Sequence, residues 1–193
     1  NADHTLNVPD RPIIPFIEGD GIGVDVTPVM LDVVNAAVRK AYGDERAISW
    51  MQVYAGQRAS EIYGAADFLP EETLHALQHY IVSIKGPLAT PIGGGIRSLN
   101  VAIRQTLDLY ACVRPIRYFP GVETPMKDSD LVDMTIFREN TEGAYVGVGG
   151  SVRKGQPEEI ALQEMVYTRR GVERIIRAAF SWAHEHGRRN VCM

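Results

Sequence analysis

Residues 13–43 have the sequence IIPFIEGDGIGVDVTPVMLDVVNAAVRKAYG. In this stretch a short apolar run is followed by a glycine cluster and then by a segment with apolar residues at helical spacing. Thr27 is expected as the N-cap of the helix, with Pro28 in its first turn and Gly43 at its end. The stretch therefore predicts a buried β-strand, a tight turn and an α-helix.

The same alternation continues along the chain. Strands are expected over 48–55 and 81–87, and helices over 69–80 and about 97–107. This order is typical of an α/β layer with a mainly parallel sheet. Further on, the sequence predicts a strand over 134–140, a glycine-rich hairpin or arm from 143, a helix over 168–187 and a strand that begins at 188. The fold class predicted is therefore α/β.

Composition narrows the possible partners. The 193 residues are 45% hydrophobic and 23% charged, with a formal net charge of −4. Nucleic acid is not expected as a partner, because no basic face is available to neutralise phosphates. A membrane is not expected either, because no apolar run is long enough to cross one. The two cysteines, Cys112 and Cys192, lack metal-ligand spacing, so we expect reduced, structural thiols in a cytoplasmic protein.

The glycine cluster at 19–23 does not predict a dinucleotide site. A Rossmann fingerprint requires its third glycine where Val24 or Val26 stands. The acidic residue expected about 20 positions further on has no clear candidate either. The remaining interpretation is a tight turn that lets the strand and the helix pack.

A second glycine run predicts an anion site. Residues 93–100 read GGGIRSLN. Glycine lets the backbone approach a ligand closely, and the start of the following helix offers free N–H groups and a positive dipole end. Ser98 and Asn100 add short side-chain donors at this end.

Three arginines are candidates for the same site. Arg104 follows Asn100 by one helical turn. Arg114 precedes a proline, which favours an extended backbone. Arg138 ends a predicted strand, where α/β sheets place ligands. Each arginine alone is more typical of the surface, but guanidinium groups pair bidentately with carboxylates. Together they predict binding of a small molecule with several carboxylates.

Three motifs resemble a known family. They are IEGDGIGVDVTP (17–28), KGPLATPIGGGIRSLNVAIRQTLDLYACVRPIRY (85–118) and IFRENTEGAY (136–145). The chain resembles the β-decarboxylating isocitrate/isopropylmalate dehydrogenases, and most closely the isocitrate branch. The resemblance implies this family's own α/β fold, which is not a Rossmann fold. Residues 1–110 would belong to a large domain and 111–193 to a small domain, with a dimer arm at about 143–165.

The resemblance also implies site residues. In the family the equivalent positions hold the three carboxylates of isocitrate, which makes the substrate ligands Ser98, Asn100, Arg104, Arg114 and Arg138. Tyr145 matches the catalytic tyrosine that protonates the enolate carbon after CO2 leaves. Thr90 and Asn100 would contact the nicotinamide cofactor. The implied enzyme is an NAD(P)-dependent, decarboxylating isocitrate dehydrogenase that forms a homodimer with a shared active site.

Part of the family's machinery has no counterpart among these residues. The metal ligands, which are aspartates that hold Mg2+ or Mn2+, and the catalytic lysine lie on segments beyond Met193, so no metal ligand is assigned. We therefore expect the chain to be incomplete. NAD and NADP stay open, since the residues that distinguish them also lie downstream and Ala89 replaces a threonine common in NADP-dependent relatives. Whether Ser98 is phosphorylated, as in some bacterial relatives, also stays open.

Two alternatives remain. The first is a related substrate: homoisocitrate, tartrate or 3-isopropylmalate. RENTEGAYVGVGG and TRRGVERIIRAAF resemble the isopropylmalate, tartrate or NAD-type isocitrate dehydrogenase branches. Isopropylmalate enzymes, however, place apolar residues where Ser98 and Asn100 stand. The second is a non-catalytic fragment or subunit that binds a polycarboxylate without turnover.

Overall fold

Two compact units make up the chain. The computed structural model describes residues 5–64, 67–89 and 98–193. Contacts divide the chain into residues 1–103 and 104–193. The division falls inside helix α4 (Leu99–Thr106), seven residues before the boundary expected at 110. The assignment of the two parts to a large and a small domain stays a prediction.

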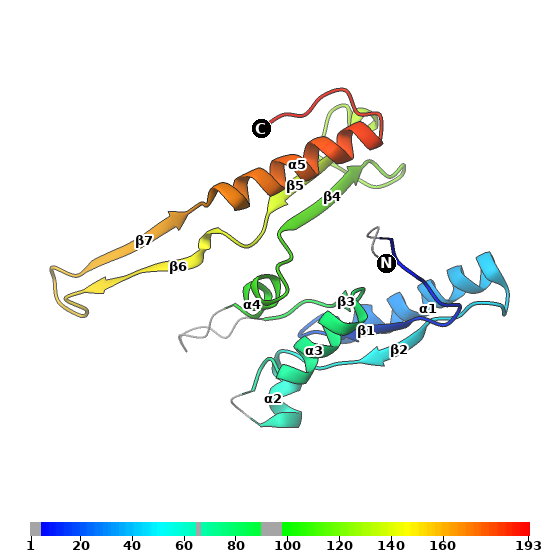
Figure 1. Ribbon diagram of the computed structural model, residues 1–193, viewed down its shortest axis with the longest axis horizontal. Helices are drawn as coiled ribbons and strands as arrows, with labels where there is room; N and C mark the ends of the chain where they lie inside the picture. The colour runs from blue at the N-terminus through cyan, green and yellow to red at the C-terminus, as the bar shows by residue number, and fades with distance from the viewer. Residues whose placement is uncertain (1–4, 65–66, 90–97) are drawn as a thin grey trace. The chain divides into compact units, whose positions relative to one another are not determined.

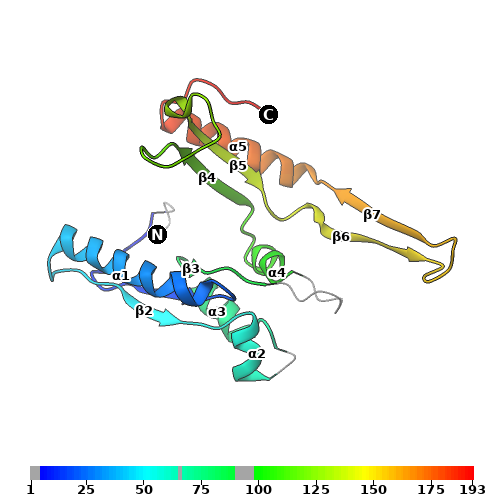
Figure 2. The same ribbon diagram turned by 180° about the vertical axis from the view of Figure 1, so that it is seen from behind.

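The first unit contains a three-stranded parallel sheet. Its central strand is β1 (Ile13–Ile17), between β2 (Ser49–Gln52) and β3 (Ile84–Lys85). Helix α1 (Gly23–Tyr42) and helix α3 (Glu71–Tyr80) lie on opposite faces of this sheet (Figures 1 and 2). Parallel strands require such crossover helices. The predicted α/β class with a parallel sheet is confirmed for this unit.

The core of the first unit forms where α3 meets β1. Ile17 and Leu77 are buried at 1% and 5% exposure. Thr73 is equally buried, and its hydroxyl donates to the Tyr54 carbonyl at 2.7 Å, so the polar group is satisfied. Helix α2 (Gln57–Tyr63) was not predicted from the sequence. It has only seven residues, which is too few for a helical period to stand out.

The predicted start of α1 is wrong. The helix begins at Gly23, four residues before the expected N-cap, and Pro28 lies within it. The Thr27 hydroxyl does not cap the helix but donates to the Glu18 carbonyl at 2.9 Å. A tertiary contact to the preceding turn therefore determines the role of Thr27, and helical spacing alone could not reveal it.

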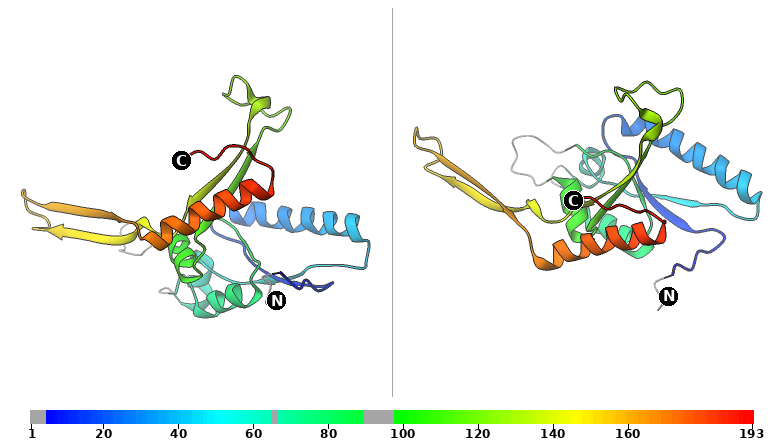
Figure 3. Two further views of the ribbon diagram at one scale, coloured as in Figure 1. Left: turned by 45° about the horizontal axis from the view of Figure 1, so that its top comes forward. Right: turned by 90° about the horizontal axis from the view of Figure 1, so that it is seen from above.

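The second unit contains two antiparallel strand pairs and one long helix. Strand β4 (Ala111–Arg117) pairs with β5 (Asp133–Glu139), which follows a short 3-10 helix, η1 (Ser129–Leu131). Strand β6 (Gly143–Val152) pairs with β7 (Ile160–Val166) in a hairpin at the position of the expected arm. Helix α5 (Arg169–Glu185) packs against β5. Figure 3 shows the hairpin extending from the N-terminal end of α5, away from β4 and β5.

Helix α5 begins and ends close to the predicted limits. The Thr168 side chain caps it by accepting the Gly171 N–H at 3.0 Å. Arg188, just past the helix, donates to Asp133 on β5 at 2.6 Å. This hydrogen bond, together with the charges of Arg188 and Arg117, holds the pKa of Asp133 below its usual range, against the opposing effect of desolvation. The expected strand from 188 is wrong, because residues 188–193 form no regular structure. Cys192 is consequently exposed, while Cys112 is half-buried; both are free thiols.

Candidate active site

The register of β4 and β5 brings two of the candidate arginines together. Arg114 pairs with Ile136, and Arg138 pairs with Cys112. Directly opposite residues share a face of a sheet, and so do alternate residues along one strand. Arg114 and Arg138 are therefore diagonal neighbours on one face. The convergence of Arg104, Arg114 and Arg138 on one ligand stays a prediction.

Helix α5 covers the other face of the same strand pair. Phe137 lies between Ile136 and Arg138 in sequence and faces α5, where its ring centroid is 5.7 Å from that of Trp182. Glu139, two residues further on, also reaches α5, with its carboxylate 3.8 Å from the Arg174 guanidinium. Strand alternation then turns Arg114 and Arg138 away from α5. The arginine-bearing face is the one that α5 leaves uncovered.

Arg138 also contacts the predicted catalytic residue. Its guanidinium Nη2 donates to the phenol oxygen of Tyr145. The guanidinium carbon lies 5.3 Å from the centroid of the Tyr145 ring, which is cation–π geometry. Tyr145 is half-buried, so the phenol is partly shielded from water. A permanent cation that suits a carboxylate thus adjoins a hydroxyl that can donate a proton.

A hydrogen-bonded carboxylate fixes the chain between Arg138 and Tyr145. Glu139 accepts the N–H groups of Thr141 and Glu142, at 2.9 and 2.7 Å, and the Thr141 hydroxyl at 2.6 Å. Partial burial acts to raise the pKa of Glu139, but these hydrogen bonds together outweigh it, so the pKa is lowered. Glu139 is therefore an ionised structural anchor, with no sign of a proton-donor role.

Arg104 and Arg114 keep their guanidinium groups available. Within the ranges 5–64, 67–89 and 98–193, neither side chain makes a hydrogen bond or ion pair. Arg104 is half-buried on α4, and Arg114 is exposed. Arg174, by contrast, is paired with Asp108 at 2.7 Å. Two unpaired guanidinium groups suit an anionic ligand.

Ser98 and Asn100 belong to the first unit. Ser98 directly precedes α4, and its carbonyl accepts the Ala102 N–H at 2.9 Å, as expected at a helix start. The Asn100 amide donates to the Leu88 carbonyl at 3.2 Å, which ties α4 to the segment after β3. Thr90 and the glycine run at 93–95 lie outside the described residues. The convergence of all the predicted ligands on one pocket stays a prediction.

Sequence reasoning missed the role of Asp20. One carboxylate oxygen accepts the Gln57 N–H at 2.9 Å, and the other accepts the Ala89 N–H at 2.8 Å. The first glycine cluster is thus the tight turn that was expected, and a Cβ on Gly19 would lie 2.3 Å from the Pro87 carbonyl oxygen. Asp20 fixes residue 89, four positions before the start of the second glycine run at 93. An acidic residue between two turn glycines was the only sequence signal for this role.

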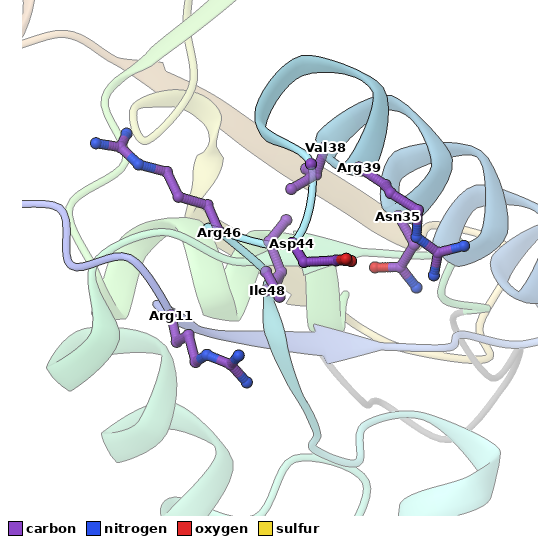
Figure 4. Close-up of a pocket in the computed structure, with 9 residues that line it drawn as sticks. Arg11, Asn35, Val38, Arg39, Asp44, Arg46 and Ile48 are labelled. Atoms are coloured by element: carbon purple, nitrogen blue, oxygen red, sulfur yellow. The ribbon is translucent and has the colours of Figure 1, made fainter.

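Two solvent-accessible cavities lie among the residues that the structure describes, and neither has the arrangement of an anion site. One of about 180 Å³ lies in the first unit, near the C-terminal end of α1, and is lined by Arg11, Asn35, Arg39, Asp44 and Arg46, among others. Figure 4 shows its arginines pointing in different directions. The other, of about 440 Å³, lies in the second unit, where Arg174 already pairs with Asp108. The charges in these cavities are therefore not arranged around a common ligand position.

Two further properties bear on function. The described residues include no group of three or more His, Cys, Asp or Glu side chains placed to hold a metal ion. Nor does any helix in the described part of the chain have the length and apolarity needed to cross a bilayer.

Comparison with known proteins gives consistent matches over nearly the whole chain. The family described as "Isocitrate/isopropylmalate dehydrogenase" matches residues 13–193. A protein of Pseudomonas aeruginosa named "Isocitrate dehydrogenase [NADP]" is 51% identical, with 100% of this chain and 51% of that protein covered. A protein of Coxiella burnetii with the same name is 56% identical, with 97% and 48% covered. The chain spans about half the length of the curated relatives it matches.

Solved structures agree with the sequence matches. Isocitrate dehydrogenase from Methylococcus capsulatus superposes with a TM-score of 0.76 at 40% identity, over 92% of this chain and 49% of that chain. The TT0538 protein from Thermus thermophilus superposes with a TM-score of 0.70 at 33% identity, over 89% of this chain and 32% of that one. The architecture described above is therefore found in experimentally determined structures.

Proposed function

Because this chain belongs to the isocitrate/isopropylmalate dehydrogenase family, we propose that the whole protein oxidises isocitrate with NADP+ and releases CO2 to form 2-oxoglutarate. The observation that carries this proposal is the contact between Arg138 and Tyr145 on the uncovered face of β4 and β5. It places a carboxylate-binding group beside a proton donor, which is what a decarboxylation followed by protonation requires.

The substrate follows from the donors at the proposed site. Isocitrate has three carboxylates, and the two neighbouring guanidinium groups of Arg114 and Arg138 suit such a polyanion. Ser98 and Asn100 can form hydrogen bonds. A substrate that placed an isopropyl group against them would leave their polar groups without partners. The names of the relatives from Pseudomonas and Coxiella support the same substrate.

The chain's own residues take part in two steps of the proposed reaction. Arg114 and Arg138 hold carboxylates, which orients the hydroxyl-bearing carbon for loss of its hydride. After the C–C bond to the departing carboxylate breaks, the carbon left behind needs a proton. Tyr145 Oη donates that proton, and the adjacent Arg138 guanidinium stabilises the phenolate that remains.

NADP is the proposed cofactor, and NAD is the alternative. NADP+ supplies the hydride acceptor when it is bound. The relatives that carry NADP in their names support this choice. Of the two residues assigned to the cofactor, Asn100 is described, and its amide nitrogen is held by Leu88, which leaves the amide oxygen for a ligand.

A divalent cation, Mg2+ or Mn2+, belongs to the proposal for the whole protein only. The described residues do not fit a metal ion, because no group of three potential ligands occurs among them. No step is therefore assigned to a metal on residues of this chain. Removal of divalent ions with a chelator should abolish turnover if the whole protein uses one.

We also propose a cytoplasmic homodimer in which the β6–β7 hairpin is an interface arm. A two-stranded hairpin alone is marginally stable in water. This one exposes five large apolar side chains: Val148, Val152, Ile160, Leu162 and Met165. Burying them against a second subunit would stabilise the hairpin. Light scattering on the purified protein would give the mass of the assembly.

The decisive experiment is a cofactor-reduction assay on the full-length protein. Isocitrate, homoisocitrate, tartrate and 3-isopropylmalate would each be tested with NADP+ and NAD+ in the presence of Mg2+. We expect the highest kcat/KM with isocitrate and NADP+. A preference for another of these acids would reassign the substrate within the family. Calorimetric binding of isocitrate without turnover would instead identify a non-catalytic polycarboxylate-binding protein.

A further inference from the structure

A side chain outside the predicted site holds the segment that carries Tyr145. Gln105, on α4, is half-buried, and its amide Nε2 donates to two backbone carbonyls. The acceptors are the Thr141 carbonyl at 2.8 Å and the Tyr145 carbonyl at 3.1 Å. Both N–H groups of the amide are thereby used, one at each end of the segment 141–145.

This segment differs from an ordinary strand. The β6–β7 register pairs Gly143 with Val166 and next pairs Val148 with Glu164, so residues 144–147 form a bulge. A bulge bends the strand and re-aims its side chains, often next to active sites. The preceding turn depends on Gly143, which has a φ of +73°. The direction of the Tyr145 side chain is therefore not determined by regular strand geometry.

Further contacts hold the start of the segment and the tip of the Tyr145 side chain. Thr141 is held by Glu139, through its N–H and its hydroxyl, and by Arg174, which donates to its hydroxyl at 2.8 Å. Arg138 contacts the far end of the Tyr145 side chain. Gln105 joins the start of the segment to the backbone of Tyr145. Its amide thus connects α4 to the bulge that presents the phenol.

We propose that Gln105 is a positioning residue for Tyr145. By holding the carbonyls of residues 141 and 145 on one amide, it fixes the bulge so that the phenol oxygen meets the Arg138 guanidinium. The role rests on the proposed function, since it matters for turnover only if Tyr145 donates a proton. A shift of about 1 Å in a reacting group can lower a rate about 100-fold. The effect of losing Gln105 should therefore appear in kcat.

The kinetic test is a double-mutant cycle in the full-length protein. Gln105→Met keeps the length of the side chain but removes both donors. We expect it to lower kcat about 10-fold or more, with KM for isocitrate changed by less than about 2-fold. In a Tyr145→Phe background, Gln105→Met should lower kcat no further, because it acts through the phenol. Independent, multiplying effects on kcat, or an effect on KM alone, would overturn the positioning role.

Two controls separate positioning from general destabilisation. Gln78 is exposed on α3, and Gln78→Met makes the same chemical change away from the site, so kcat should stay at the wild-type value. Gln105→Asn keeps the two donors on a shorter side chain, and its kcat should lie between those of wild type and Gln105→Met. If Gln105→Met does not fold, Gln105→Asn takes its place in the double-mutant cycle with Tyr145→Phe. The same comparison of kcat values then tests the positioning role.

A structural measurement tests the positioning role without relying on turnover. Fluorotyrosine placed at position 145 reports the surroundings of this ring by 19F NMR. Gln105→Met should shift or broaden the resonance, whereas Gln78→Met should leave it unchanged. An unchanged resonance in Gln105→Met overturns the positioning role whether or not the protein turns over isocitrate. A wild-type protein that turns over no 2-hydroxy acid overturns the proposed function, while the resonance still tests the position of the ring.

Discussion

Arg114 and Arg138 are diagonal neighbours across the β4–β5 pair, on the face turned away from α5. They are 24 positions apart in the sequence, and the antiparallel register alone brings them to the same face. A slip of one residue would turn one of them toward α5. The packing of Phe137 against Trp182 opposes such a slip, so an apolar contact on one face maintains the charge arrangement on the other.

For substrate binding, the two-pronged guanidinium geometry of Arg138 should matter more than its positive charge. Lysine at this position keeps a cation but cannot bind a carboxylate bidentately while it contacts Tyr145. We expect Arg138→Lys to lower kcat/KM for isocitrate about 100-fold, or about 2.7 kcal/mol of transition-state stabilisation. Arg177→Lys, at an exposed position on α5, is the matched control. Equal kcat/KM values for the two variants would show that Arg138 does not bind substrate in this way.

Glu139 should contribute stability that is lost in acid. Its pKa is lowered in the folded protein from the ordinary value of 4.5. A lowered pKa means that the contribution is fully present above pH 4.5 and disappears as the pH falls through the folded-state value. Glu139→Gln should lower the free energy of unfolding at pH 7 by about 1–2 kcal/mol, since one charged acceptor is lost.

Denaturant titrations of Glu139→Gln and wild type at several pH values would measure this difference. It should shrink as the pH falls below 4.5. A difference that stays constant down to the acid limit would mean that the folded state does not favour the ionised form.

Gly86 should not tolerate a side chain. A Cβ there would lie 1.9 Å from the Glu18 carbonyl oxygen, and the Gly86 N–H donates to Ile17 at 2.7 Å, next to the β1–β3 pairing. We expect Gly86→Ala to cost about 3 kcal/mol or more, because backbone on both sides must move. Gly150→Ala, where a Cβ would meet nothing within 4 Å, is the control. Thermal unfolding would compare them; similar midpoints would contradict the close packing of these two turns.

Thr27 should stabilise the turn before α1 through its hydroxyl. The side chain is 4% exposed, and the hydroxyl donates to the Glu18 carbonyl. Thr27→Val preserves the shape but leaves that carbonyl without this donor, so we expect a loss of about 1–2 kcal/mol. Thr106→Val, at an exposed position on α4, should change stability by less than about 0.5 kcal/mol. Chemical denaturation would show whether the two substitutions differ.

The sequence predicted the elements that local patterning specifies. The strand at 13–17, the helix at 169–185 and the hairpin after 143 all follow from apolar spacing and glycine placement. It did not predict the start of α1, because the Thr27 hydroxyl bonds to a turn that only the folded chain brings near. The strand expected after 188 was wrong for a similar reason. An apolar run becomes a strand only where it has a neighbour to pair with.

The candidate site was predictable in part. Residue type and position indicated Arg114 and Arg138, whereas Tyr145 and the role of each residue were implied by the resemblance to a known family. The link from Gln105 to the backbone of Tyr145 left no trace in the sequence, since an amide can bond to any carbonyl and the partners lie 36 and 40 residues away. Such side-chain-to-backbone bonds depend on tertiary structure alone.

The two carboxylate oxygens of Asp20 have a consequence for how this chain can vary. They accept the first N–H of α2 and the N–H of Ala89. One side chain therefore links three turns: the one after β1, the one before α2 and the one after β3. An insertion or deletion in any one of these turns would pull Asp20 away from the other two. The lengths of the three loops are therefore coupled, and homologues should change them together or not at all, even though loops on a protein surface usually vary independently.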